Sequence, residues 1–261
     1  MTPRLLFDEL WARGDALATV YESLVALGIP QSKADELLRA EWVARVAALD
    51  LFVHELFAMR MLEQFEGARL PVPGFAKFRL SAETITRMVN SSSASERSAA
   101  FDLEVRTQIS HLTFQMPDKI AEALRHTSSI PLWESVAKHQ NPGVKGEALK
   151  SAQRTIKTTL SSMVERRNKI AHEGDLGPTV PRQPWPIDVG QLVTVRGFIL
   201  GLVESIQQVM DDDSAPAVAA TGAASVLENE PVDDEEGEAV DDVACGDVAD
   251  QAPPPAGQEF Y

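Results

Sequence analysis

Cysteine is almost absent from this chain, which has Cys245 as its single copy. One cysteine excludes an intramolecular disulfide and every cysteine-based zinc motif. The histidines offer no substitute, because His54-Glu55 begins like a zinc-protease motif but Ala58 stands where its second histidine belongs. We therefore expect no metal and no cofactor, and a reducing compartment is consistent with the composition.

Uninterrupted apolar runs of membrane-spanning length are also lacking. The two most apolar windows, residues 46–62 and 193–209, contain charged residues at several positions. The amino-terminal residues lead directly into an amphipathic pattern without the apolar core of a signal sequence. These features predict a soluble, cytoplasmic protein that makes no membrane contact.

Lysine and arginine are missing from residues 211–261, which contain fifteen aspartates and glutamates. The preceding 210 residues carry 24 acidic and 24 basic residues, so the net charge of -15 belongs to this last segment. Its composition cannot bury enough apolar surface to offset the entropy of ordering. We expect a helical domain over residues 1–210 and a disordered acidic tail over 211–261. The tail is either a solubilising appendage or a mimic of nucleic acid that competes for a basic site.

β-Hairpin signals are absent from the first 210 residues, whereas apolar residues recur there at spacings of three and four. This periodicity predicts an all-α fold. Residues 32–66 give the most apolar helix, with core positions at Leu38, Trp42, Val46, Leu49, Val53, Leu56 and Phe57. The other predicted helices cover residues 3–27, 82–90, 94–114, 117–128, 144–173 and 188–210, with a short turn at 131–139. Ser81 is the expected cap of the helix from 82, and Asp188 with Gln191 has the form of a capping box.

The helix predicted over residues 144–173 has one apolar stripe. At about 100° per residue, the residues within roughly 80° of Leu160 are Leu149, Ile156, Met163, Val164, Ile170 and Ala171. Arg167 falls inside this stripe at about -20°, while Asn168 and His172 lie on its flank at about +80° and +120°. An arginine there needs a partner if it is buried, or it lies where two surfaces meet. The alternative is that these residues have no functional role. Arginine and histidine are favourable at the negative end of a helix dipole, and an arginine can extend its guanidinium to water.

The motif Arg167-Asn168-Lys169-Ile170-Ala171-His172 resembles the Arg-x4-6-His signature of the HEPN superfamily. The wider segment 163–175 is similar to the RiboL-PSP-HEPN branch, and residues 48–56, 113–120, 132–133 and 185–188 agree with it in order. The resemblance covers residues 32–210 approximately, without the acidic tail. It implies a helical bundle with long antiparallel helices.

The same resemblance implies a metal-independent endoribonuclease that acts as a homodimer, with two motif helices facing one cleft. His172 would act as general acid or base, because an imidazole titrates near neutral pH. Arg167 would hold the scissile phosphate through its bidentate fork. Asn168 would orient the phosphate or the imidazole, and Arg166 and Lys169 would bind RNA. A symmetric dimer would supply two copies of each group.

The sequence leaves three functions open. The first is this ribonuclease, in phage defence or a toxin-like stress response with a neutralising partner protein, roles that the resemblance suggests. Ten basic against four acidic residues from Lys119 to His172 suit an RNA backbone, although a solvated helix face explains them nearly as well. The second is a non-catalytic HEPN protein that binds RNA, nucleotides or a partner, and the third an interaction protein that works through its acidic tail. The intact pair of Arg167 and His172 favours the first.

Overall fold

The computed structural model describes residues 2–213, which form eight α-helices and one short 3-10 turn and contain no β-strand. The all-α prediction is therefore confirmed. The predicted tail lies outside the described residues from position 214 onward. The elements are α1 (Pro3–Ala26), α2 (Gln31–Phe65), η1 (Phe75–Lys77), α3 (Ala82–Val89), α4 (Ala94–Ile109), α5 (Pro117–Leu124), α6 (Leu132–Gln140), α7 (Gly146–Glu173) and α8 (Val189–Asp212).

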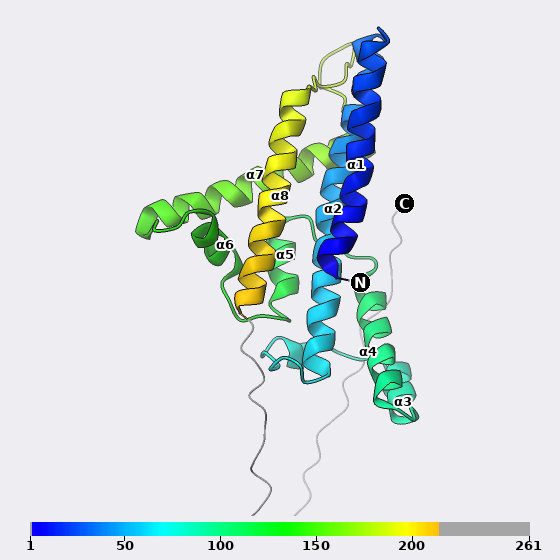
Figure 1. Ribbon diagram of the computed structural model, residues 1–261, viewed down its shortest axis with the longest axis vertical. Helices are drawn as coiled ribbons and strands as arrows, with labels where there is room; N and C mark the ends of the chain where they lie inside the picture. The colour runs from blue at the N-terminus through cyan, green and yellow to red at the C-terminus, as the bar shows by residue number, and fades with distance from the viewer. Residues whose placement is uncertain (1, 214–261) are drawn as a thin grey trace, which may run out of the picture. The chain divides into compact units, whose positions relative to one another are not determined.

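Helix α2 is the central element and contacts α1, α4, α5, α7 and α8. In Figure 1, α1 and α8 run alongside α2, while α7 crosses behind α8 to reach α2. The short link between α1 and α2 makes those two helices antiparallel neighbours. This arrangement brings the carboxyl end of α7, which carries the motif, against the amino-terminal half of α2.

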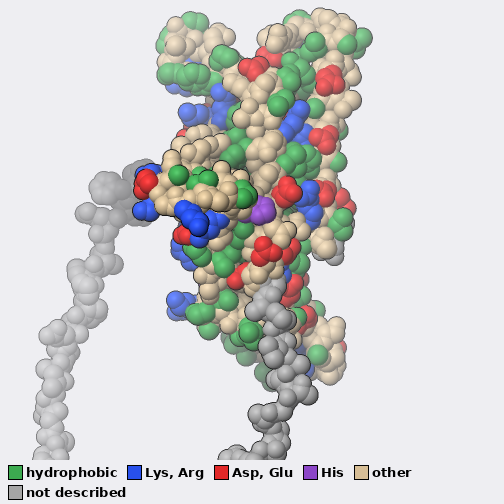
Figure 2. Space-filling view, turned by 60° about the vertical axis from the view of Figure 1, so that its left-hand side comes forward, with side chains coloured by type: hydrophobic (Ala, Val, Ile, Leu, Met, Phe, Trp, Pro, Cys, Tyr) green, Lys and Arg blue, Asp and Glu red, His purple; other side chains and the backbone are tan. Residues whose placement is uncertain are grey.

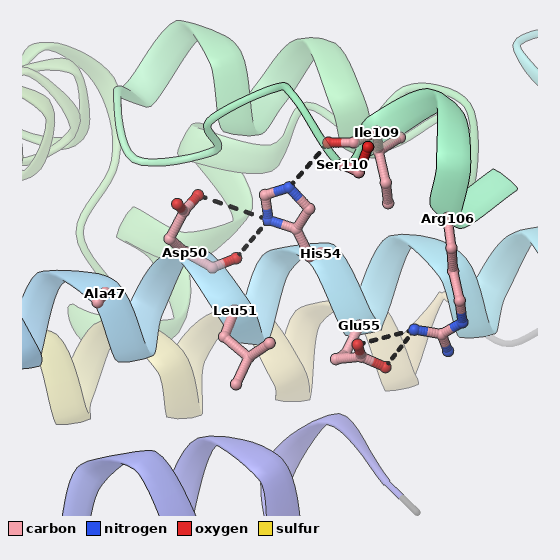
Figure 3. Close-up of a pocket in the computed structure, with 8 residues that line it drawn as sticks. All are labelled: Ala47, Asp50, Leu51, His54, Glu55, Arg106, Ile109 and Ser110. Carbon is pink, nitrogen blue, oxygen red and sulfur yellow. Dashed lines mark hydrogen bonds and ion pairs between the residues drawn. The ribbon is translucent and has the colours of Figure 1, made fainter. Parts of the chain in front are cut away.

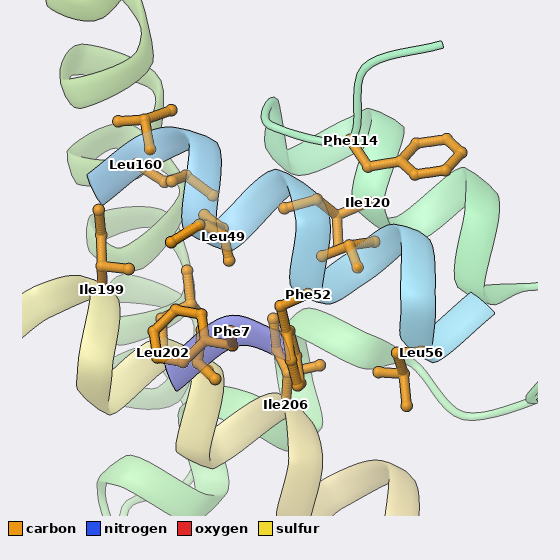
Figure 4. Packing of buried hydrophobic residues seen from close by; sticks show 14 of the residues in the cluster. Phe7, Leu49, Phe52, Leu56, Phe114, Ile120, Leu160, Ile199, Leu202 and Ile206 are labelled. Atoms are coloured by element: carbon orange, nitrogen blue, oxygen red, sulfur yellow. The ribbon is translucent and has the colours of Figure 1, made fainter. Parts of the chain in front are cut away.

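The core forms where α2 meets its neighbours. All seven core positions predicted in α2 are buried. Figure 4 shows Leu49 and Phe52 of α2 packed with Phe7 of α1 and with Leu202 and Ile206 of α8. These five side chains are at most 1% exposed, and burying each is worth about 1.5–3 kcal/mol.

Helix starts agree closely with the sequence expectation because they depend on local chemistry. The Ser81 hydroxyl accepts a hydrogen bond from the backbone N–H of Thr84, and the Asp188 carboxylate accepts one from that of Gln191. These caps satisfy amide groups that the first helical turn leaves without partners. The predicted starts of α3 and α8 are confirmed.

Helix ends agree less well. The helix predicted over 94–114 stops at Ile109, because the Asp50 carboxylate of α2 binds the backbone N–H of Phe114 at 2.5 Å and Gln115 Nε2 at 3.0 Å. The helix predicted over 117–128 likewise ends at Leu124. The turn expected at 131–139 is instead the helix α6, which packs against α7 and α8.

The last helix continues beyond Met210 into the segment predicted as tail. Asp211 pairs with Arg60 of α2, and the Asp213 carboxylate accepts a hydrogen bond from the Ser128 hydroxyl at 2.5 Å. The first three acidic residues after Met210 are therefore part of the folded domain. By length and composition α8 also passes as a membrane-spanning helix, a test that the core helix of a soluble protein passes equally. Its nine buried residues face the protein core.

A buried ionic network joins α1, α2 and α8. Glu41 and Arg45 of α2 are both fully buried. The Glu41 carboxylate accepts hydrogen bonds from Arg45 and, at 2.6 and 2.7 Å, from Arg196 of α8. Arg45 also donates to the Trp11 carbonyl at 2.8 Å and to the Asp15 carboxylate at 2.6 Å, both on α1. The network therefore fixes three helices around one carboxylate.

Gly14 of α1 leaves room for the Arg45 guanidinium. A Cβ at this position would lie 2.6 Å from Arg45 Cζ, closer than carbon atoms approach without repulsion, and the hydrogen bonds of Arg45 prevent it from moving away. We expect Gly14→Ala to lower the free energy of unfolding by about 1–3 kcal/mol, as measured by urea denaturation. Gly197→Ala is the matched control, because a Cβ at Gly197 of α8 meets nothing within 4 Å. Gly197→Ala should raise the free energy of unfolding by up to about 1 kcal/mol. If Gly14→Ala and Gly197→Ala changed the free energy of unfolding in the same direction, the packing argument would be contradicted.

Candidate functional site

The motif lies at the carboxyl end of α7, where the buried stripe of that helix runs out. Leu149, Ile156, Leu160, Met163 and Val164 are buried, as the periodicity predicted. Ile170 is partly buried, and Ala171 is exposed. The predicted apolar face therefore faces the core for most of its length but reaches the surface around the motif.

Gly174 and Asp175 terminate α7 and fix its last turn. Gly174 has a φ of 64°, the left-handed conformation in which glycine carries no steric penalty. Asp175 follows with a φ of 57° and donates its backbone N–H to the carbonyl of Lys169 at 3.0 Å. Its side chain is fully buried. The chain just after the motif is thus turned back toward α2.

The buried Asp175 carboxylate is held by two arginines. Arg39 Nε of α2 donates to Oδ2 at 3.0 Å, and Arg166 Nη2 of α7 donates to the same oxygen at 2.7 Å. Arg39 also donates to the carbonyl of Trp185 at 2.8 Å. These bonds connect α2, α7 and the connection from α7 to α8. Arg166, which we expected to bind RNA, is engaged in this internal contact.

Arg167 points differently from its neighbour. It is partly buried, and its Nη1 donates to Asn168 Oδ1 at 3.1 Å. Its Nε is buried and has no hydrogen-bond partner among residues 2–213. A buried N–H of a charged group without an acceptor is costly. The guanidinium is therefore oriented by Asn168, and within residues 2–213 its Nη2 has no hydrogen-bond partner.

The remaining motif side chains are open to solvent. Asn168, Lys169 and His172 are all exposed. His172 lies one turn after Asn168 on the same flank of α7, as the helical spacing predicted. No hydrogen bond joins its imidazole to another residue of the described part. Asn168 and His172 therefore share one flank of α7, and Arg167 reaches that flank through its contact with Asn168.

Ion pairing neutralises most of the basic residues from position 119 to 172. Six of the ten bases from position 119 to 172 pair with carboxylates: Lys119, Lys138, Lys150, Arg154, Lys157 and Arg166. Within residues 2–213, the other four, Arg125, Lys145, Arg167 and Lys169, have no carboxylate at ion-pair distance. Figure 2 shows basic and acidic side chains interspersed on the visible face. Two of the four unpaired bases therefore lie at the end of α7, and the other two lie at the end of α5 and just before α7.

His54, the other histidine considered for the cleft, belongs to a different part of the fold. Figure 3 shows its ring between α2 and the end of α4. Nδ1 lies 2.9 Å from the Asp50 carbonyl oxygen and Nε2 lies 3.2 Å from that of Ile109. The ring also packs on Phe114 at 4.4 Å between centroids. The expectation that His54 packs near the core agrees with these contacts.

Comparisons of the chain with protein-family models, with curated proteins and with solved structures give no match. Within residues 2–213, no three histidine, cysteine or acidic side chains come close enough to hold a metal ion. The site therefore has to be interpreted from its own geometry.

Sequence reasoning missed the role of the charged residues on the inner face of α2. Arg39, Glu41 and Arg45 are buried among the core positions of that helix. Charges at core spacing were a visible signal that ionic contacts fix α2 to its neighbours. Their partners, Asp175 and Arg196, are more than 130 residues away in the chain, so spacing alone could not identify them.

Proposed function

We propose that this protein is a metal-independent endoribonuclease of the HEPN type, in which Arg167 and His172 form the reaction centre. The observation that carries the proposal is the unequal treatment of two adjacent arginines. Arg166 is neutralised by the buried Asp175 carboxylate, whereas Arg167 has no carboxylate at ion-pair distance among residues 2–213 and contacts Asn168, one helical turn before the exposed His172.

The chemistry needs no metal because RNA supplies its own nucleophile. A base removes the proton of the 2′-hydroxyl, and the 2′-oxygen attacks phosphorus. The bond from phosphorus to the 5′-oxygen breaks, and an acid protonates that oxygen, which leaves a 2′,3′-cyclic phosphate. His172 suits the proton transfers, and the Arg167 fork suits the charge that develops on the phosphate oxygens.

A homodimer completes this site. The reaction requires an acid and a base, and each chain contributes a single histidine to the motif face. The surface beside the motif includes partly exposed apolar side chains at Leu176 and Trp185, which a second copy could cover. We further propose a role in phage defence or a toxin-like stress response in the cytoplasm, with a neutralising partner protein.

The test is cleavage of end-labelled single-stranded RNA in EDTA by the full-length protein. We expect fragments that end in 2′,3′-cyclic phosphate, and rates at least about a hundredfold lower for His172→Ala and Arg167→Ala. Both substituted side chains point to the surface or lie partly exposed, so circular dichroism should show unchanged folding. RNA with 2′-deoxyribose at the cleaved position should resist cleavage.

Matched controls are His139→Ala on α6 and Arg97→Ala on α4, which replace exposed residues outside the motif. Both should cleave at the wild-type rate. Equal cleavage by wild type and His172→Ala would contradict the proposal, as would RNA binding without cleavage across many sequences. The latter result would favour the non-catalytic RNA-binding alternative. Specific activity should also rise with protein concentration in step with the dimer fraction.

A further inference from the structure

A large cavity of this fold lies away from the motif, between α2, the end of α4 and α5. Its volume is about 600 Å³, within the range of small-molecule sites. In Figure 1, α4 and α5 flank α2 on opposite sides of its carboxyl-terminal half. The spacing along α2 separates the cavity from the helix that carries the motif. Phe57 lines the cavity and is 15 residues beyond Trp42, which contacts α7. That separation is roughly 22 Å along the helix axis.

The lining of this cavity combines aromatic rings with cations. Its apolar part comprises Phe57, Phe78, Ile109, Leu112, Phe114 and Ala123. Flat apolar side chains of this kind suit the faces of a planar ligand. Lys77, Arg79 and Lys119 lie around them.

The charge on these cations is largely unbalanced. Glu122 is the single carboxylate among the lining residues, and it pairs with Lys119 at 2.9 Å. Lys77 and Arg79 have no carboxylate at ion-pair distance within the described chain. The cavity therefore presents two uncompensated positive charges, on exposed side chains, beside its apolar walls.

Hydrogen bonds hold the walls in place. Gln108 Nε2 of α4 donates to the Arg79 carbonyl at 2.7 Å and to Glu104 at 2.8 Å. Hydrogen bonds from Thr84, Gln108 and Ser81 lower the pKa of Glu104 to about 2. This carboxylate therefore stays ionised at neutral pH and keeps the segment before α3 attached to α4. The cavity is preformed, so a ligand does not have to order it.

His126 adds an orienting group to the same wall. Its Nδ1 lies 2.8 Å from the carbonyl oxygen of Gly74, so Nδ1 carries the proton of that hydrogen bond. In the neutral ring Nε2 is then an acceptor. Gly74 itself has no room for a side chain, because a Cβ would lie 2.0 Å from the Arg125 carbonyl oxygen. The close backbone contact keeps the imidazole fixed.

We propose that this cavity binds a small aromatic anion, a molecule with a planar apolar body and a carboxylate, sulfonate or phosphate group. The body lies against the phenylalanines, and the anionic group lies between Lys77 and Arg79. This site is independent of the proposed ribonuclease site, since it shares none of its residues.

Isothermal titration of the full-length protein with naphthalene-2-sulfonate tests the proposal. We expect saturable binding with one site and a Kd below about 1 mM. Neutral 2-naphthol should bind at least about tenfold more weakly, and inorganic phosphate should give no saturable signal. Equal binding of 2-naphthol and the sulfonate would overturn the charge argument. Displacement of the sulfonate by a single-stranded RNA octamer at lower concentration would identify an RNA-binding surface instead and overturn the proposal.

Arg79→Glu gives the matched variant. Arg79 is exposed, so the change should leave the thermal unfolding midpoint unaltered while weakening naphthalene-2-sulfonate at least about tenfold. Arg97→Glu reverses an exposed charge on α4 outside the cavity and should leave the Kd unchanged. An unchanged Kd for Arg79→Glu, or equal losses for the two variants, would refute the site. RNA cleavage by Arg79→Glu should equal that of wild type, which separates this proposal from the ribonuclease proposal.

Discussion

Replacing Glu41 with alanine is expected to lower the free energy of unfolding by roughly 3–5 kcal/mol, the usual result of breaking a buried ion pair. Glu41 is fully buried and neutralises two arginines, Arg45 and Arg196. A guanidinium is not deprotonated in proteins, so both arginines keep their charge when the carboxylate is removed. Two positive charges would remain between α1, α2 and α8 with Asp15 as the remaining partner of one of them.

Urea denaturation followed by circular dichroism measures this loss. Glu147→Ala is the matched control, because Glu147 of α7 also pairs with two bases but its side chain is 71% exposed. Exposed pairs contribute about 0–1 kcal/mol, so the control should change little. A loss for Glu41→Ala no greater than that of the control would show that the network does not stabilise the fold.

Replacing Asp175 should give the second large effect, on both stability and the motif. We expect Asp175→Asn to cost roughly 3 kcal/mol, because Arg39 and Arg166 lose their shared buried carboxylate. Asparagine tolerates the φ of 57° at this position. Asp175→Ala should cost about 1 kcal/mol more, since alanine is strained in the left-handed region.

Hydrogen exchange with mass spectrometry locates the consequence. The amides of residues 169–186 should exchange faster in Asp175→Asn, whereas those of α4 should not. If the ribonuclease proposal holds, cleavage should fall as well, because the turn that carries His172 loses its attachment to α2. Asp118→Asn is the control, since Asp118 pairs with Lys157 but is exposed. Protection of residues 169–186 that matches wild type would refute the positioning role of Asp175.

Local features of this fold were predictable because local chemistry determines them. The caps at Ser81 and Asp188 and the buried face of α7 follow from spacing and side-chain chemistry over one or two helical turns. The end of α4 was not predictable in this way. Residues 110–114 have no strong helix-breaking residue, and the helix stops there because Asp50 of α2 binds the amide of Phe114.

The end of α8 gives the same lesson for the acidic segment. Composition placed Asp211–Asp213 with the tail, because an acidic run without bases is typical of a disordered chain. The fold instead provides Arg60 and Ser128 as partners for these carboxylates. Composition describes the average tendency of a segment, whereas a specific partner changes the free energy of individual residues.

For the candidate site, the sequence by itself determined that α7 carries Arg167 on its apolar face and Asn168 and His172 on the flank, because helical periodicity fixes the angles between them. Only the tertiary structure distinguished Arg166 from Arg167. Asp175 reaches Arg166 through a left-handed turn and meets Arg39 from α2, while Arg167 donates to Asn168 and has no carboxylate at ion-pair distance within residues 2–213. Adjacent residues on a helix point about 100° apart, so what each one contacts depends on the element packed against that side.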